Sequence, residues 1–118
     1  MKTLHSFKHA FRGLRNFFRE EQNARVEASI AVVAILLGFR FHIDHYEWIC
    51  VLLCIGAVLS AEAFNTAIEA LCDKVEPEKD PLIAKAKDVA AGAVLILAIV
   101  SAIIGLHIFL PYVFRILN

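Results

Sequence analysis

The sequence predicts an all-α integral membrane protein with three transmembrane helices and an amphipathic surface helix ahead of them, in a single domain covering residues 1–118. Two observations carry this prediction. Hydrophobic residues make up 59% of the chain, against roughly 45–50% in a soluble globular domain. The chain also contains a long apolar run over 89–110, in which His107 is the one side chain more polar than serine. A water-soluble enzyme is therefore the wrong starting picture.

The first element is the amphipathic helix, expected over about residues 4–20. Apolar side chains recur at spacings of three and four from Leu4 to Phe18, and basic side chains repeat this rhythm one position later, from Lys8 to Arg19. Such a pattern predicts a helix lying on a membrane surface, with its aromatic face down and its basic stripe toward anionic headgroups. A soluble core helix is the alternative, and a chain that already spans the bilayer disfavours it.

The first transmembrane span is expected over about residues 28–43, and it is the shortest. Its apolar part, Ala28–Phe39, covers only about 18 Å at the rise of an α-helix. We expect the span to be completed by Arg40 and His42, whose polar ends can reach the interface, and by burial against protein at the other end.

The second and third spans are clearer. The second, over about 46–71, opens with the interfacial pair Tyr46 and Trp48. The third, over 89–110, measures about 33 Å, enough for a hydrocarbon core of roughly 30 Å. Pro111 follows where such a helix can end.

Basic residues predict the orientation of these spans. The segment before the first span holds six Lys and Arg, and the loop Cys72–Asp88 holds four, whereas the opposite side has only Arg40 and Arg115. This imbalance places the N-terminus and the 72–88 loop in the cytoplasm. The whole chain balances 12 basic against 12 acidic residues, so nothing favours nucleic acid as a partner.

An acidic stripe marks the candidate site. At 100° per residue, Glu62, Asn65, Glu69 and Asp73 share an arc of about 80°. Ionisable groups at membrane depth are expensive unless they are paired, protonated, hydrated or bound to a cation. Hydrogen bonding between helices, or hydration by headgroup water, is the alternative reading and suits Asp73. We expect Glu62 and Glu69 to be functional.

More polar side chains fall at the same expected membrane face. They end the surface helix, lead into the first span and precede the third: Glu20, Glu21, Asn23, Arg25, Glu27, Lys85, Lys87 and Asp88. Carboxylates with Asn suit Mg²⁺, and lysines suit phosphate oxygens. The pattern indicates a metal and nucleotide site, although a simply solvated charge cluster is the alternative. The familiar glycine-rich nucleotide motifs are absent from the sequence, and scattered histidines without a CxxC pattern do not favour zinc.

The segments EAFNTAIEALCD (62–73), AKDVAAGAVLI (86–96) and AFRGLRNFFREEQNAR (10–25) resemble the prokaryotic diacylglycerol kinase family, which includes undecaprenol kinases. The likeness extends over nearly the whole chain. It implies a homotrimer in the bacterial cell membrane, with N-terminus and active site in the cytoplasm, that transfers the γ-phosphoryl of MgATP to a lipid hydroxyl.

The resemblance also implies roles for individual residues. Glu62 would be the general base on the lipid hydroxyl, supported by Asn65, while Glu21 and Glu69 would hold the Mg²⁺ that bridges the ATP phosphates. The residues expected to contact ATP are Lys2, His9, Glu21, Glu69, Lys79, Asp80, Lys87 and Asp88. The lipid acceptor would be bordered by Asn23, Arg25, Glu27 and Glu62.

The acceptor lipid is less sharply defined. The segment SAIIGLHIFLP (101–111) resembles the undecaprenol kinase branch, so undecaprenol is favoured and diacylglycerol is the alternative. Asp80, His9 and Glu27 depart from residues common among relatives at these positions. A small cation-coupled transporter would explain Glu62 but has no use for the surface helix and lysine cluster. A noncatalytic assembly subunit would need Glu62 and Glu69 only for stability.

Overall fold

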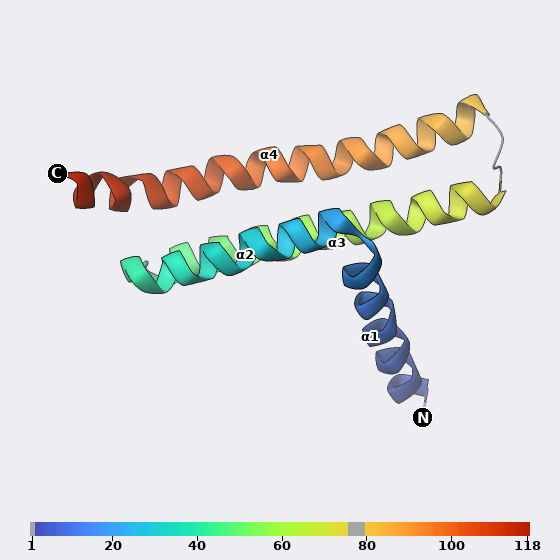
Figure 1. Cartoon of the computed structure of the whole chain (residues 1–118), viewed down its shortest axis with the longest axis horizontal. Coiled ribbons are helices and arrows are strands. Elements are labelled where there is room, and N and C mark those ends of the chain that lie inside the picture. Colours follow the sequence, from blue (N-terminus) through green and yellow to red (C-terminus); the bar gives the residue numbers. More distant parts are fainter. Residues whose placement is uncertain (1, 76–79) are drawn as a thin grey trace.

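The computed structural model describes residues 2–75 and 80–118, and these form four helices with no strand among them. The helices are α1 (Lys2–Glu20), α2 (Gln22–Phe41), α3 (His45–Val75) and α4 (Pro81–Leu117). In Figure 1, α2, α3 and α4 form a bundle in which successive helices run antiparallel, and α1 projects sideways from the start of α2. The all-α prediction is confirmed.

We call the two ends of the bundle proximal and distal. At the proximal end α1 meets α2, α3 ends and α4 begins, and both α3 and α4 extend beyond the start of α2 (Figure 1). At the distal end α2 ends, α3 begins and α4 ends. The described Lys and Arg side chains near the distal end include Arg40 and Arg115, each in the last turn of its helix.

Two of the described helices, α3 and α4, are long and apolar enough to cross a membrane. The second and third expected spans lie within them. The helix α2 does not meet the same requirement of composition and length, so a third span stays a prediction. It packs on α3 through small residues seven apart, because Ala24, Ala31 and Gly38 are its buried positions.

Gly38 allows the Trp48 side chain of α3 to pack directly against the backbone of α2. A Cβ atom added there would lie 2.6 Å from the Cη2 atom of Trp48, which is too close for any side chain. The α2 helix ends just beyond, where His42 adopts the left-handed conformation (φ 54°). The amide N–H groups of His42 and Ile43 donate back to the carbonyls of Phe39 and Gly38, which satisfies two of the helix's last acceptors.

The helices differ from the predicted ranges at most of their ends, and two of these differences have a local cause. The α2 helix begins at Gln22 and ends at Phe41 rather than running from 28 to 43, since a polar first turn precedes the apolar part and His42 stops it. The α4 helix does not end at Pro111 but continues to Leu117. Proline removes an N–H donor and its ring crowds the carbonyl four residues earlier, but Tyr112 just after it is held by contacts described next.

The distal end is closed by a compact cluster. Ile43, Val51 and Ile108 are buried, with Phe41 and Tyr112 among the side chains packed against them. The rings of Phe41 and Tyr112 are stacked with centroids 5.6 Å apart. These contacts join the end of α2, the start of α3 and the end of α4.

Polar groups at the distal end are paired with one another. Asp44 Oδ1 accepts a hydrogen bond from the amide of Glu47 at 2.9 Å, and Glu47 Oε1 accepts one from the amide of Asp44 at 3.0 Å. This reciprocal capping box starts α3. The Tyr112 hydroxyl also donates to Glu47 Oε1, and the Arg115 guanidinium lies 4.7 Å from the centre of the Tyr112 ring.

Candidate active site

The corner between α1 and α2 is held by Arg25. Its Nη1 atom donates to the carbonyls of Phe18 at 3.1 Å and Arg19 at 2.7 Å. These carbonyls belong to the last turn of α1, where helical partners are missing. The family resemblance implies that Arg25 borders the lipid, and this stays a prediction; in the structure its guanidinium is engaged in this corner. The corner in turn fixes Glu21 as the residue between the two helices.

Two polar side chains of the acidic stripe on α3 are buried. Glu62 is 6% exposed and Asn65 is 9% exposed, one helical turn apart on the same face. Glu69 and Asp73 continue the stripe but are exposed. The stripe therefore runs from a buried part near the middle of α3 to a solvent-accessible part at the proximal end.

Side chains from the α1–α2 corner meet the buried end of this stripe. Asn23 lies within hydrogen-bonding reach of Glu62, and the carboxylates of Glu21, Glu27 and Glu69 lie close enough for their charges to act on it. The structure thus brings together residues that the sequence separates by about 40 positions. Four carboxylates around one buried position repel one another unless a proton or a cation joins them.

Asn65 has one polar atom without a partner. Its Nδ2 atom donates to Glu69 Oε1 at 3.1 Å, and since an ionised carboxylate can only accept, the amide nitrogen is the atom that faces Glu69. The carbonyl oxygen Oδ1 is buried and finds no hydrogen-bond partner within 2–75 and 80–118. Leaving such an acceptor unsatisfied costs about 1–3 kcal/mol. The site therefore holds an oxygen available to a cation or a donor.

This donor set fits Mg²⁺ that arrives with a nucleotide. The described residues contain no cluster of three or more His, Cys, Asp or Glu side chains that could hold a metal by themselves. Mg²⁺ is commonly bound by one or two carboxylates together with substrate phosphates. Glu21 and Glu69 near Glu62, with the free Asn65 oxygen, supply that share of the ligands.

Two of the predicted nucleotide residues near the proximal end, Lys87 and Asp80, have partners within the chain. Lys87 Nζ contacts Asp73 Oδ1 at 2.6 Å and ties the start of α4 to the end of α3. This hydrogen bond raises the pKa of Lys87, which precedes the expected span and stays cationic. Asp80 caps α4 by accepting from the amides of Leu82 and Ile83. Lys79 lies outside the described residues.

Lys2 and His9 lie apart from this group. Both are on α1, whose free end points away from the bundle (Figure 1). At the rise of an α-helix, Lys2 lies about 27 Å and His9 about 17 Å from the end of α1 at Glu20. One copy of the chain therefore does not bring these two residues to the Glu62 cluster.

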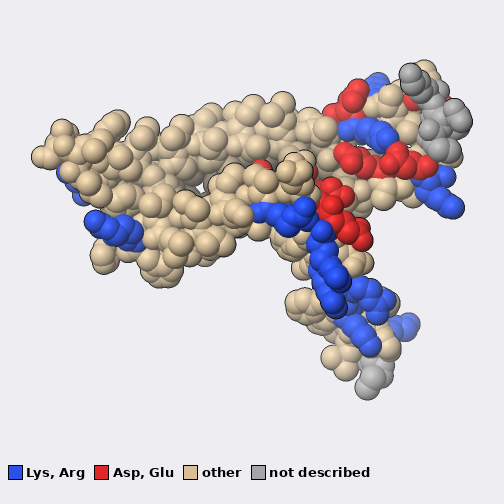
Figure 2. Space-filling view, viewed as in Figure 1, with Lys and Arg blue, Asp and Glu red and all other residues tan. Residues whose placement is uncertain are grey.

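Figure 2 shows how charge is distributed over one face of the molecule. Acidic side chains gather where α1 meets the bundle and along the proximal parts of α3 and α4, with Lys or Arg beside them. Basic side chains line one flank of α1, and the middle of the bundle carries almost no charge on this face (Figure 2). Nucleotide phosphates and a metal are thus best accommodated at the proximal end.

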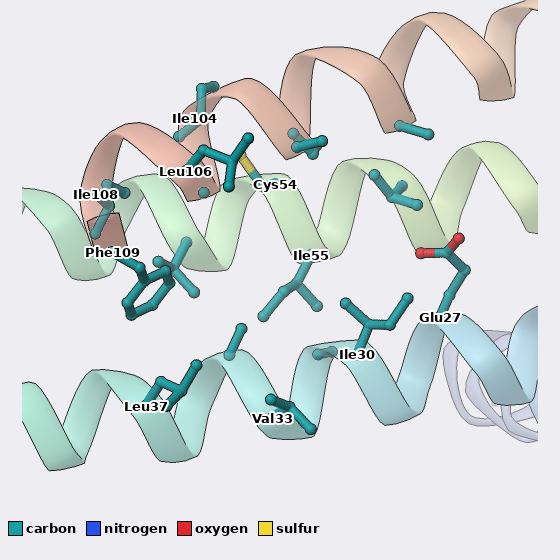
Figure 3. A pocket seen from close by; sticks show the side chains of 18 of the residues that line it. Glu27, Ile30, Val33, Leu37, Cys54, Ile55, Ile104, Leu106, Ile108 and Phe109 are labelled. Carbon is teal, nitrogen blue, oxygen red and sulfur yellow. The ribbon is translucent and has the colours of Figure 1, made fainter. Parts of the chain in front are cut away.

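Sequence reasoning missed an apolar cavity between α2, α3 and α4. It has a volume of about 590 Å³ and its lining includes Glu27 at one end and Phe109 at the other (Figure 3). Its lining residues come from three helices and each is an ordinary residue of an expected span. The only sequence signal is that several of them are small, among them Ala98, Ala102 and Gly105.

Comparison with known proteins identifies the family of the chain. A sequence model described as prokaryotic diacylglycerol kinase matches residues 8–109. The undecaprenol kinase of Bacillus subtilis is 43% identical over 106 residues, which cover 90% of this chain and 86% of that protein. The diacylglycerol kinase of Haemophilus influenzae is 30% identical, covering 86% and 87%, and that of Escherichia coli K12 is 30% identical, covering 80% and 78%. The matched region contains Glu62, Asn65 and Glu69, and the chain belongs to the prokaryotic diacylglycerol kinase family.

Proposed function

We propose that this protein is an ATP-dependent lipid kinase that transfers the γ-phosphoryl of MgATP to the hydroxyl of a membrane lipid. Undecaprenol is the favoured acceptor, and diacylglycerol is the alternative. The observation that carries the proposal is the buried Glu62, set among further carboxylates at the proximal end of an apolar bundle. The relative at 43% identity is an undecaprenol kinase, whereas those at 30% are diacylglycerol kinases.

Glu62 is the proposed general base. It accepts the proton of the lipid hydroxyl, whose oxygen then forms a bond to the γ-phosphorus while the bond from that phosphorus to the bridging oxygen of ADP breaks. Burial of Glu62 limits the access of water, which would otherwise compete with the lipid as acceptor. Asn23, within hydrogen-bonding reach of Glu62, orients the carboxylate.

Asn65 and Glu69 form the nucleotide side of the proposed site. Asn65 is a positioning residue, because its amide holds Glu69 by the 3.1 Å hydrogen bond. Glu21 and Glu69 would hold Mg²⁺, which when bound neutralises charge on the phosphoryl group in transfer. Lys87 and Asp88 at the start of α4 would contact the phosphates, and Lys87 supplies a positive charge there.

Membrane placement follows from α1. Its apolar side chains are exposed, Leu4 at 66% and Phe11 at 69%, while its basic side chains lie on the opposite flank (Figure 2). A helix of this kind lies in the interface with its apolar face buried. We place α1 on the cytoplasmic surface, α2 across the membrane with α3 and α4, and the proximal end at the cytoplasmic interface.

A homotrimer is part of the proposal. The chain leaves Lys2 and His9 far from its own Glu62 cluster, so their expected contacts with ATP require the α1 helix of a neighbouring copy. Three narrow helices also offer little surface to enclose both ATP and a lipid. A site shared between protomers accounts for both observations.

The test is phosphorylation of the two lipids by the purified protein in mixed micelles with MgATP. Undecaprenol is expected to be phosphorylated more efficiently than diacylglycerol. Phosphorylation of neither lipid would show that the proposal is wrong. The cation-coupled transporter gains no support, since all the relatives compared above are named as kinases.

A further inference from the structure

The apolar cavity between α2, α3 and α4 begins beside the candidate active site. Among the described residues that line the cavity, Glu27 is the charged one. Glu27 also lies close enough to Glu62 for its charge to act there. In Figure 3 the Glu27 carboxylate lies at one end of the cavity, and the labelled side chains along the rest of it are apolar or, at Cys54, a thiol. The cavity thus opens toward the proposed phosphoryl acceptor position.

The other end of the cavity stops at the distal cluster. Val51, Ile108 and Phe109 line it there, and Val51 and Ile108 are each only 5% exposed within the distal cluster. Along α2 the lining runs from Glu27 to Leu37, which corresponds to about 15 Å. This length is about half of a hydrocarbon core of roughly 30 Å, so the cavity is a slot of limited depth that ends at the distal cluster.

We propose that this slot binds the part of a polyprenyl chain nearest its hydroxyl, and so selects a single-chain alcohol as acceptor. The inference rests on the proposed lipid kinase function, and it adds the position of the polyprenyl chain in the protein. A lipid alcohol is an apolar chain with one polar end, and the slot likewise has an apolar lining with one polar end at Glu27. The volume of about 590 Å³ falls within the roughly 300–1,000 Å³ of small-molecule sites.

The shape of the slot favours one branched chain over two straight ones. The slot is one groove that stops at the distal cluster, which suits one chain, whereas diacylglycerol brings two. On α4 the small residues Ala98, Ala102 and Gly105 alternate with larger lining residues such as Ile104 and Leu106, and the gaps they leave give room for methyl branches. The rest of a long polyprenol must leave the slot into the bilayer.

Gly105 provides a direct way to fill the slot. A Cβ added to Gly105 meets no heavy atom within 4 Å, and Gly105 lines the slot. Leucine at this position therefore projects into open space rather than into backbone. Gly92 is the matched control, because it lies on the same helix, also meets nothing within 4 Å and does not line the slot.

The first experiment measures KM and kcat of Gly105→Leu and Gly92→Leu in nanodiscs, with undecaprenol and with a prenyl alcohol too short to reach Gly105. We expect Gly105→Leu to raise the KM for undecaprenol about tenfold, with the KM for ATP and for the short alcohol unchanged. Gly92→Leu should match the wild type. An equal effect of both variants, or an unchanged KM for undecaprenol in Gly105→Leu, would overturn the inference.

A second measurement does not depend on turnover. A prenyl alcohol carrying a diazirine is photolysed with the wild-type protein in phospholipid nanodiscs without ATP, and the labelled residues are mapped. Labelling of Val51 or Ile108 that excess undecaprenol prevents supports the slot. Labelling confined to exposed residues such as Leu95 or Ile103, or cross-links showing that a second copy fills the slot, refutes it. If the wild type phosphorylates no lipid alcohol, the proposed function fails, and the labelling still decides whether the slot binds the chain.

Discussion

The distal and proximal ends of the bundle both contain polar side chains, but they satisfy them differently. At the distal end Asp44 and Glu47 exchange hydrogen bonds with each other's amides, and the Tyr112 hydroxyl donates to Glu47. At the proximal side Glu62 is buried among other carboxylates, and Asn65 Oδ1 has no partner in the described part of the chain. The distal groups are complete without a ligand, whereas the proximal groups are not.

This difference distinguishes polar groups that stabilise the fold from polar groups that bind a ligand. A paired polar group contributes to folding, and its loss lowers stability. A buried group left without a partner costs stability in the free protein and is retained where a ligand completes it. Mutations at the two ends should therefore have opposite profiles: loss of transfer without unfolding at the proximal end, and loss of stability without loss of transfer at the distal end.

The largest effect is expected at Glu62. Glu62→Gln keeps the shape of the side chain but removes the proton acceptor, and we expect kcat to fall by about 10²–10⁴-fold. Binding of MgATP, measured by equilibrium titration, should stay near the wild-type value. Glu47→Gln is the matched control, because it makes the same chemical change on the same helix at the distal end. Equal loss of kcat in both variants would contradict the claim that only the proximal end takes part in phosphoryl transfer.

Glu69 is expected to show the next largest effect, on nucleotide binding rather than on chemistry. Glu69→Gln removes a proposed metal ligand and changes the partner of the Asn65 amide. Even outer-shell partners are worth roughly 10–100-fold in metal affinity, so the KM for MgATP should rise by at least about tenfold. A titration of activity with Mg²⁺ should shift in the same direction. An unchanged Mg²⁺ requirement would contradict the assignment.

Gly38→Ala should produce the distal profile. Its added Cβ would lie 2.6 Å from the Trp48 side chain, so the indole or the two helices must shift, and overpacking of this kind costs about 1–3 kcal/mol. Unfolding in mixed micelles, followed by denaturant titration, measures this loss. The specific activity of the folded fraction should remain that of the wild type. A stable but inactive variant would show that the distal end takes part in catalysis.

The smallest effect is expected for the ion pair between Lys87 and Asp73. Both side chains are substantially exposed, 38% and 65%, and exposed pairs contribute little to stability. Asp73→Asn should leave the unfolding transition unchanged. Lys87→Gln should also leave it unchanged but raise the KM for ATP, since it removes a proposed phosphate contact. A clear loss of stability in either variant would make this pair structural.

Much of the proximal site could be predicted from helical periodicity alone. Glu62 and Asn65 lie within one continuous helix, so their shared face follows from residue spacing, and the structure buries both side chains. The role of Arg25 could not be predicted, because its carbonyl partners become available only where the chain breaks at Glu21, and neither glycine nor proline marks that break.

Contacts between residues far apart in the chain could not be predicted from the sequence either. The hydrogen bond from Tyr112 to Glu47 joins residues 65 positions apart and helps to hold α4 in place beyond Pro111, where the sequence predicted an end. The slot between α2, α3 and α4 exists only because three helices pack with small residues facing it. Its lining residues carry no pattern within any one helix that sets them apart from other residues of a span.

The most direct test of the account is a single-turnover measurement of phosphoryl transfer from labelled MgATP to undecaprenol. Wild type, Glu62→Gln and Glu47→Gln are compared in the same nanodiscs, each saturated with nucleotide. The account predicts rapid formation of the labelled lipid phosphate by wild type and Glu47→Gln, and retained ATP with almost no lipid phosphate for Glu62→Gln. Transfer by Glu62→Gln at the wild-type rate would contradict the role of Glu62 as the base.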